Sequence, residues 1–277
     1  MTDQIKVALA QISCKVGDKV HNIKKMSRYI AKARKEHAEL VIFPELAITG
    51  YTMRDTIYEL AESIPGPSTE KMEELARQNN IHIIYGMAER TREAGAVLHN
   101  TAVLTSPSGT IGCYRKTYLP THSVFEEKRY FRQGYDIPVY STDIGKIGMI
   151  VCYDIFFPET ARLLRLKGAE LIACISASPA VRRNYFETLT IARALENTVY
   201  LAYANLAGIE DGLQFWGGSR IIMPNGKIAV QAKYDNEDLV YCVIDYTDLE
   251  RTETFIPVLR DLRPELYAEL KELASGL

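Results

Sequence analysis

The stretch GKIGMIVCYDIFFPE, residues 145–159, constrains the fold of this chain more than any other segment. An apolar run ends at Cys152, and a turn then leads to a helix that opens at Pro158. The pattern predicts a buried strand that ends in a strand-to-helix turn carrying a thiol. Such turns expose nucleophiles, because the backbone amides that follow can bind a developing oxyanion. A single cysteine on an apolar strand is, however, more often a small core residue, so the evidence for a reactive thiol must come from other segments of the chain.

Two other predicted strands also end next to a charged side chain. The segment LVIFPELAITGY, residues 40–51, carries Glu45 just after an apolar run. The segment YRKTYLP, residues 114–120, carries Lys116 among aromatic and apolar neighbours. A thiol, a carboxylate and an amine therefore each lie at the end of a predicted strand.

These three groups together are suited to acyl transfer onto a thiolate. Glu45, partly desolvated, would accept the proton of Cys152 and later return one to the leaving amine. Lys116 would supply positive charge at the oxyanion, with the amide of Tyr153 as a second donor. Asp154 is interpreted as a structural residue that orders the turn after Cys152.

The three segments, in this order and spacing, resemble the nitrilase superfamily of carbon-nitrogen hydrolases. The ISASP segment followed by arginines, residues 175–183, resembles the amidase domain of NAD synthetases. The likeness to the superfamily extends to EKRYFRQG at 127–134, LIACISASP at 171–179, ARALENTVYLAYAN at 192–205 and FWGGSRIIMPNG at 215–226. The resemblance implies a triad of Glu45, Lys116 and Cys152 and a second glutamate that positions the lysine and helps to orient substrate or water. That glutamate falls on Glu127; the adjacent Glu126 leaves its placement open by one residue, although the following KRYF favours Glu127.

Helical and strand-like periods alternate along the chain and predict an α/β fold in one domain, residues 1–277. Strands are expected at 5–13, 39–44, 81–89, 98–105, 110–118, 147–151, 170–176, 198–205, 219–223, 228–232 and 238–244, and helices at 20–33, 69–80, 158–167 and 185–196. Two similar halves predict two packed sheets with helices outside. The resemblance sharpens this to a four-layer αββα sandwich with two mixed sheets.

Composition limits the partners of the chain. With 33 basic and 35 acidic residues, the net charge of -2 gives no electrostatic case for binding nucleic acid or a membrane surface. No apolar run reaches the ~18 residues of a membrane span, and the N-terminus does not read as a signal peptide. Five cysteines without a paired spacing favour a reducing compartment, so we expect a cytoplasmic protein. The acyl-transfer chemistry described above needs no metal and no organic cofactor.

Candidates for substrate binding lie near the predicted strand ends. Arg183 follows the ISASP segment and could clamp a substrate carboxylate, although a solvated loop arginine is an equally good interpretation. Aromatic rings could wall the acyl pocket, and some of them belong to the core. The candidates are Tyr51, Tyr153, Phe157, Ser178, Arg183 and Trp216.

The two helices expected at 158–167 and 185–196 carry more apolar surface than a monomer should expose. The resemblance implies that they pack against the same pair in a second subunit. We therefore expect a homodimer or a larger homo-oligomer.

The sequence thus predicts thiol-dependent hydrolysis of a small amide, or carbamoyl amide, to a carboxylic acid and ammonia or an amine. One alternative is a nitrilase, because the same thiol can add to a nitrile carbon. Another is a glutaminase that feeds ammonia to a separate protein, since no synthetase segment follows in this chain. A catalytically silent scaffold is the alternative outside the enzymes, and the four intact site residues argue against it.

Overall fold

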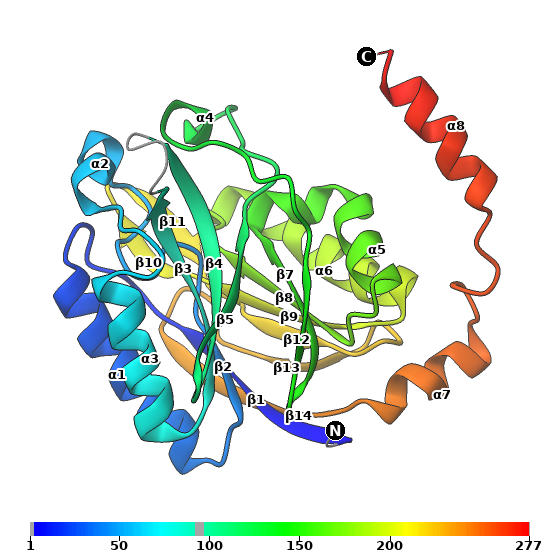
Figure 1. Ribbon diagram of the computed structural model, residues 1–277, viewed down its shortest axis with the longest axis horizontal. Coiled ribbons are helices and arrows are strands. Elements are labelled where there is room, and N and C mark those ends of the chain that lie inside the picture. Colours follow the sequence, from blue (N-terminus) through cyan, green and yellow to red (C-terminus); the bar gives the residue numbers. More distant parts are fainter. Residues whose placement is uncertain (1–2, 92–96, 277) are drawn as a thin grey trace.

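The computed structural model of the protein describes residues 3–91 and 97–276. Its centre is a pair of six-stranded mixed sheets, with strand orders β14-β1-β2-β3-β4-β5 and β13-β12-β9-β8-β7-β6 (Figure 1). In each sheet three neighbouring strands run parallel, and antiparallel strands extend the sheet on both sides. The two halves of the chain are therefore built alike, as the sequence predicts.

The first sheet comprises β1 (Gln4–Gln11), β2 (Leu40–Ile42), β3 (His82–Arg90), β4 (Leu98–Ser106), β5 (Gly109–Arg115) and β14 (Asp238–Asp245). The second comprises β6 (Val139–Thr142), β7 (Gly145–Val151), β8 (Leu171–Ser176), β9 (Tyr200–Asn205), β12 (Arg220–Ile222) and β13 (Ile228–Gln231). A separate hairpin pairs β10 (Ala207–Glu210) with β11 (Leu213–Trp216).

Two helices cover the outer face of each sheet (Figure 1). The helices α1 (Lys19–Lys35) and α3 (Pro67–Asn79) pack on the first sheet, and α5 (Pro158–Leu166) and α6 (Arg183–Asn197) on the second. Because strand side chains alternate between faces, Val7 of β1 joins the core between the sheets, whereas Ala8 joins the core under α1 and α3. The layers run helix, sheet, sheet, helix, which confirms the predicted fold class.

The buried stripe of α1 differs from the sequence prediction. Val20, expected in the stripe, is 80% exposed, and the polar Asn22 is buried in its place. The side chain of Asn22 accepts a hydrogen bond from the amide of Lys15 and donates to the carbonyl oxygens of Lys15 and Ile48. Hydrogen bonding to two loops thus places a polar residue where periodicity alone favours an apolar one.

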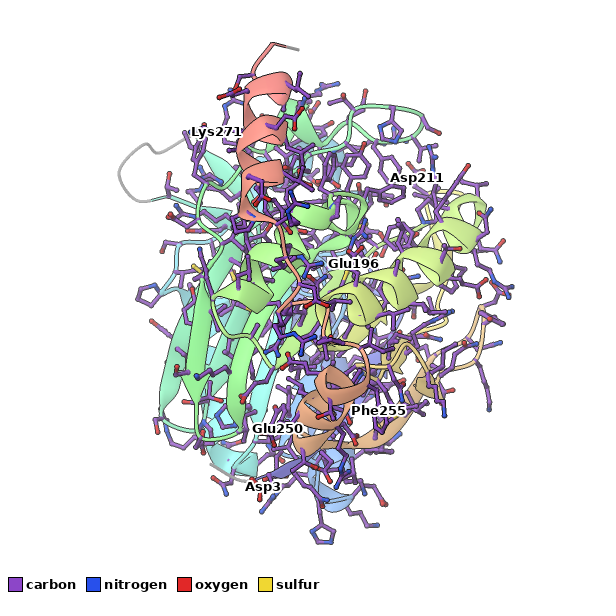
Figure 2. All side chains as sticks on the ribbon, turned by 90° about the vertical axis from the view of Figure 1, so that its right-hand side faces the viewer. Asp3, Glu196, Asp211, Glu250, Phe255 and Lys271 are labelled. Atoms are coloured by element: carbon purple, nitrogen blue, oxygen red, sulfur yellow. The ribbon has the colours of Figure 1, made fainter. Side chains whose placement is uncertain are left out.

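The C-terminal region holds two helices that the sequence analysis did not assign, α7 (Thr247–Phe255) and α8 (Pro264–Ala274). Helix α8 lies away from the sheets, and none of its residues is buried (Figure 1). Figure 2 faces the side of the molecule that carries α6 with Glu196, α7 with Phe255, and α8 with Lys271. The remaining short helices are η1 (Arg54–Thr56), α2 (Ile57–Leu60), α4 (Glu127–Tyr130), η2 (Cys152–Phe156) and η3 (Ala180–Arg182).

Across residues 3–91 and 97–276, none of the helices combines the length and the apolar character that crossing a membrane requires.

Candidate active site

The site lies where strands of both sheets end at one edge of the sandwich. Glu45 follows β2 and Lys116 follows β5, both in the first sheet, while Cys152 follows β7 in the second. The backbone amide of Ala177, just beyond β8, donates to the carboxylate of Glu45 and so joins the two sheets at this edge. The four predicted catalytic side chains, those of Glu45, Lys116, Cys152 and Glu127, are buried.

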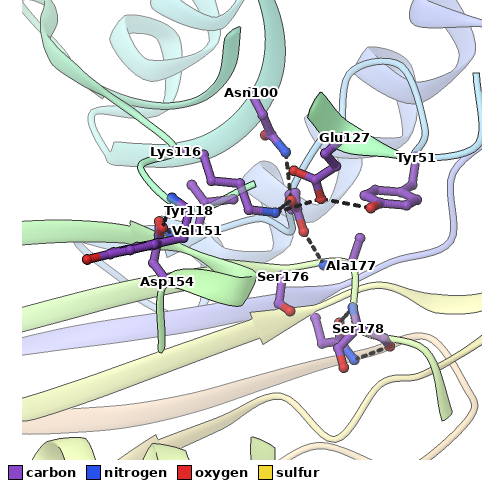
Figure 3. Close-up of polar contacts among 12 residues, drawn as sticks. Tyr51, Asn100, Lys116, Tyr118, Glu127, Val151, Asp154, Ser176, Ala177 and Ser178 are labelled. Carbon is purple, nitrogen blue, oxygen red and sulfur yellow. Dashed lines mark hydrogen bonds and ion pairs between the residues drawn. The ribbon is translucent and has the colours of Figure 1, made fainter. Parts of the chain in front are cut away.

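Glu45 is fully buried, and its two carboxylate oxygens accept the hydrogen bonds that Figure 3 draws from Asn100, Lys116 and Ala177. Its Oε1 atom accepts from Lys116 Nζ at 2.8 Å and from Asn100 Nδ2 at 2.7 Å, and its Oε2 atom accepts from the amide of Ala177 at 2.7 Å. Lys116 Nζ also donates to Glu127 Oε1 at 2.7 Å. One buried ammonium therefore holds two carboxylates in fixed positions.

The charges of this cluster depend on one another. Burial by itself would lower the pKa of Lys116, but Glu127 and Glu45 outweigh it and hold that pKa well above its usual value. Burial raises the pKa of Glu127 to about 7 against the opposing effect of Lys116. Lys116 is thus a permanent cation, whereas Glu127 titrates near neutrality. The Oε2 atom of Glu127 is buried and has no hydrogen-bond partner among the described residues.

Of the two adjacent glutamates that the sequence left open, Glu127 is the one that contacts Lys116 in the structure. Glu127 lies in the first turn of α4 and is 4% exposed, with Lys116 and Tyr51 as its partners. Glu126, the residue before that helix, is exposed to solvent.

Cys152 occupies a sharp turn between β7 and η2. Its φ angle is +48°, a left-handed conformation that is rare for residues other than glycine and is frequent where a side chain must be presented at a strand end. Burial and the nearby Glu45 raise the pKa of the thiol well above its usual value, although Lys116 and Ser176 oppose this. The resting thiol is therefore protonated, and it needs a base to become a nucleophile.

Asp154 links the turn of Cys152 to the segment that carries Lys116 through three hydrogen bonds. Its Oδ2 atom accepts from the amide of Val151 at 2.9 Å and from the Tyr114 hydroxyl at 2.8 Å, and its Oδ1 atom accepts from the amide of Tyr118 at 2.8 Å. Burial raises the pKa of Asp154 to about 6. These contacts fit the structural role that the sequence analysis gave this residue.

Gly86 of β3 explains how Glu45 can pass so close to the sheet. A Cβ atom at this position would lie 2.3 Å from the backbone nitrogen of Leu46 and 2.7 Å from the Cα atom of Glu45. The amide of Gly86 also donates to the carbonyl oxygen of Pro44. Only a residue without a side chain leaves space for this loop.

Three of the predicted substrate-binding residues lie close to the cluster. The Tyr51 hydroxyl donates to Glu127 Oε1 at 2.8 Å. Ser178 follows Ala177, and its Oγ atom accepts from Trp216 Nε1 at 3.2 Å. Both Ser178 and Trp216 are buried, and their hydrogen bond lies next to Ala177, whose amide binds Glu45.

Tyr153 and Phe157, two predicted pocket residues that follow Cys152, are half-buried. The ring of Phe157 stacks on Tyr118 with centroids 3.5 Å apart, and it meets Tyr153 edge-on at 5.3 Å. Together with His122, these rings border a cavity of about 240 Å³ on this side of the nucleophile turn.

Arg183 does not join the cluster. Its Nε atom donates to Glu187 at 3.1 Å, one turn further along α6, and its guanidinium lies 3.5 Å from the centre of the Tyr234 ring. Glu187 and Tyr234 engage the guanidinium of Arg183 in this structure, and a role of Arg183 in substrate binding stays a prediction.

A cavity of about 580 Å³ reaches the cluster from the side of Tyr51 and Glu127. It is large enough for a small organic molecule. Its other charged lining residues are Arg54, Asp55, Glu126, Arg129 and Asp211.

Sequence reasoning missed two polar residues that hold the cluster. Asn100, which donates to Glu45, lies in β4 between His99 and Thr101, so one more polar residue in this strand gave no signal. Glu210 lies at the end of β10 and binds the backbone beside Tyr51. It falls in a segment for which the periodicity predicted no element.

Comparison with known proteins places this arrangement in a family. Residues 6–254 match the family described as carbon-nitrogen hydrolase. A nitrilase of Pyrococcus abyssi is 36% identical over 95% of this chain and 99% of its own length. The omega-amidase of Homo sapiens is 31% identical over 92% of this chain and 94% of its own length. The glutamine-dependent NAD(+) synthetase of Acinetobacter baylyi is 32% identical over 87% of this chain, which corresponds to 44% of that protein.

Solved structures agree with these relatives. A carbon-nitrogen hydrolase from Helicobacter pylori G27 superposes with a TM-score of 0.89 at 27% identity, covering 97% of this chain and 98% of the other. A mutant of the amidase from Nesterenkonia sp. AN1, with the acetamide moiety of fluoroacetamide added covalently at its active-site cysteine, superposes with a TM-score of 0.83 at 27% identity, covering 96% of both chains. The chain therefore belongs to the carbon-nitrogen hydrolase family of enzymes within the nitrilase superfamily.

Proposed function

We propose that this enzyme hydrolyses the C–N bond of a small amide through a thioester on Cys152. The observation that carries the proposal is the buried cluster of Glu45, Lys116 and Glu127 together with the buried thiol of Cys152 at a strand end of the second sheet. The covalent adduct at the cysteine of the related amidase supports a nucleophilic thiol in this fold.

In the first half-reaction, Glu45 accepts the proton of Cys152 as the sulfur attacks the carbonyl carbon. The oxyanion that forms is stabilised by Lys116 Nζ and by the amide of Tyr153 in the first turn of η2. The C–N bond then breaks, Glu45 gives its proton to the leaving nitrogen, and ammonia or an amine departs. The acyl group remains on sulfur as a thioester.

In the second half-reaction, Glu45 accepts a proton from water, which attacks the thioester carbon. The C–S bond breaks, the proton returns to the sulfur of Cys152, and the carboxylic acid leaves. Glu127 keeps Lys116 in place throughout, and its unpartnered Oε2 atom is available to an N–H group of the substrate amide. Each oxyanion donor contributes about 3 to 4 kcal/mol to lowering the barrier.

Nitrile hydrolysis is the second candidate, and the 36% identity to the Pyrococcus abyssi nitrilase favours it. The sulfur of Cys152 would add to the nitrile carbon to give a thioimidate, a first water would replace its nitrogen and release ammonia, and a second water would cleave the C–S bond of the resulting thioester to give the acid. The likeness to NAD(+) synthetase keeps glutamine among the amides to be tested, with the ammonia passing to a separate protein.

Ammonia release from a panel of amides, N-carbamoyl compounds, glutamine and nitriles tests the proposal. We expect release from an amide class with the wild type and none with Cys152→Ala, while Cys174→Ala, which removes a buried thiol in the middle of β8, remains active. Release from nitriles alone would establish the second candidate. No release from any compound, with a Cys152 that does not react with iodoacetamide, would refute the proposal and favour a silent scaffold.

We further propose that the enzyme is a homodimer, or a larger assembly of such dimers, formed through α5 and α6. Apolar side chains on these helices are exposed, among them Leu166 at 56%, Leu163 and Tyr185. Burying this surface against its own copy would remove it from water. Analytical ultracentrifugation at micromolar concentration should give a dimer that Leu166→Glu dissociates; a monomeric wild type would contradict the proposal.

We also propose a cytoplasmic location, supported by five cysteines that are all free thiols in the structure. Cell fractionation with an antibody against the protein checks this. Recovery in a secreted or envelope fraction would overturn it.

A further inference from the structure

Glu210 is a buried carboxylate that the proposed reaction does not use. It is the last residue of β10, where Ile209 faces solvent and Glu210, by strand alternation, faces inward and is 4% exposed. Among the described residues it pairs with no lysine or arginine, and its Oε1 atom has no hydrogen-bond partner. Burying a carboxylate without a cation costs folding free energy, and the hydrogen bonds that the carboxylate accepts must offset that cost.

Those hydrogen bonds all go to the backbone and side chain of one short segment. Glu210 Oε2 accepts from the amide of Tyr51 at 2.8 Å, from the amide of Thr52 at 3.1 Å and from the Thr52 hydroxyl at 3.4 Å. The segment approaches closely because Gly50, with a φ angle of +81°, precedes it; a Cβ atom there would lie 3.0 Å from Val16 Cα and 3.4 Å from Glu210 Oε1. Glu210 therefore fixes the backbone from which the Tyr51 side chain projects.

The Tyr51 side chain is in turn held at its ring and at its hydroxyl. The ring meets Phe125 and Phe215 edge-on, at centroid distances of 6.3 and 6.0 Å. The hydroxyl donates to the same Oε1 atom of Glu127 that accepts from Lys116, as Figure 3 shows. A continuous chain of contacts thus runs from Glu210 through Tyr51 and Glu127 to the ammonium of Lys116.

We propose that Glu210 is a positioning residue, which holds the Tyr51 hydroxyl on Glu127 and thereby fixes the geometry of Lys116. The inference rests on the proposed function of the cluster. Glu210 acts only through Tyr51, because its carboxylate contacts the backbone of residues 51 and 52 and not the reacting groups. Displacing a positioning contact by about 1 Å can lower turnover roughly 100-fold.

Glu210→Ala tests the inference, with Glu210→Gln as the variant that keeps the volume and one acceptor oxygen. We expect kcat to fall roughly 10- to 100-fold in Glu210→Ala and much less in Glu210→Gln, while both retain the wild-type fold by circular dichroism. Glu170→Ala is the matched control. Its carboxylate also accepts from a backbone amide, that of Lys146, but it lies at the opposite end of the second sheet.

Two readouts separate positioning from a merely structural role. Because Glu210 acts through Tyr51, the double variant Glu210→Ala/Tyr51→Phe should be no slower than the slower single variant. The Tyr51 hydrogen bond lowers the pKa of Glu127, so its loss should move the acid limb of the pH profile to higher pH. The groups that set this limb are Glu127 itself with Lys116, Glu45 and Tyr51 around it.

Alkylation of Cys152 by iodoacetamide, followed by mass spectrometry of its peptide, needs no known substrate. Its rate and pH profile should change in Glu210→Ala as they do in Tyr51→Phe and remain unchanged in Glu170→Ala. Additive effects of the two substitutions, or an unchanged alkylation profile in Glu210→Ala, would overturn the inference. Absence of Cys152-dependent ammonia release in the wild type would instead refute the proposed function, so the two failures are distinguishable.

Discussion

Replacing Lys116 by methionine removes the only cation that contacts Glu45 or Glu127 among the described residues. Methionine fills a similar volume but leaves two buried carboxylates without their shared ammonium. Removing one partner of a buried ion pair typically costs about 3 to 5 kcal/mol of unfolding free energy. We expect Lys116→Met to lose stability by about this amount at pH 7, together with its activity.

The unfolding free energy lost in Lys116→Met should depend on pH, and the protonation of the buried carboxyl groups determines whether the loss grows or shrinks as the pH rises. In the wild type, burial raises the pKa of Glu127 to about 7, so the folded state holds a proton that the unfolded state releases near pH 4 to 5. A group whose pKa is raised by folding stabilises the protein at low pH and loses that contribution as the pH rises. Without Lys116, the carboxyl pair of Glu45 and Glu127 keeps a proton to still higher pH. Above pH 7 the difference in unfolding free energy between the wild type and Lys116→Met, here called the stability gap, should therefore widen by about 1.4 kcal/mol per pH unit.

Urea denaturation followed by circular dichroism at pH 6, 7 and 8, at one protein and salt concentration, measures this gap. Lys25→Met is the control, because Lys25 Nζ pairs with Glu237 at 2.7 Å in a partly exposed position. That pair should contribute about 1 kcal/mol or less, and the lowered pKa of Glu237 keeps its titration below this range. A gap for Lys116→Met that stays constant from pH 6 to pH 8, or matches that of the control, would refute the reasoning.

Two other substitutions test the geometry around the cluster. Gly86→Ala places a methyl group 2.3 Å from the backbone after Glu45, so it should cost about 1 to 3 kcal/mol or more in thermal unfolding and lower ammonia release sharply; full activity would mean that the loop can move aside. Asp154→Asn puts an NH2 group opposite one of the two backbone amides that Asp154 now accepts from, so kcat should fall while KM changes little. A rise in KM with unchanged kcat would instead place Asp154 in substrate binding.

The main features of the site could be predicted because they are local to strand ends. The end of an apolar run indicates to within two residues where a strand ends, at Val151 for β7 and at Ile42 for β2, and parallel strands bring such ends to one edge of a sheet. Cys152, the proposed nucleophile, and Glu45, the proposed base, lie within three residues of those ends. Their catalytic roles remain predictions until the substitutions described above are assayed.

The rest of the site depends on contacts that no local pattern reports. Glu210 binds the amide of Tyr51 across 159 positions of the chain, and Asn100 reaches Glu45 across 55. Arg183 was assigned to the site because it follows a strand end, but Glu187, one helical turn later, pairs with it. Helix α8 has no buried face, so nothing in the described fold restricts its sequence in the way that a core does.

The division of the site between two sheets has a consequence for partial unfolding. Glu45 and Lys116 are delivered by the first sheet, and Cys152 and the amide of Ala177 by the second. Each sheet alone can retain all of its own hydrogen bonds and still hold only half of the chemistry. Separation of the two sheets would therefore abolish turnover while the secondary structure is still intact. On gradual denaturation, activity should be lost before the circular dichroism signal changes.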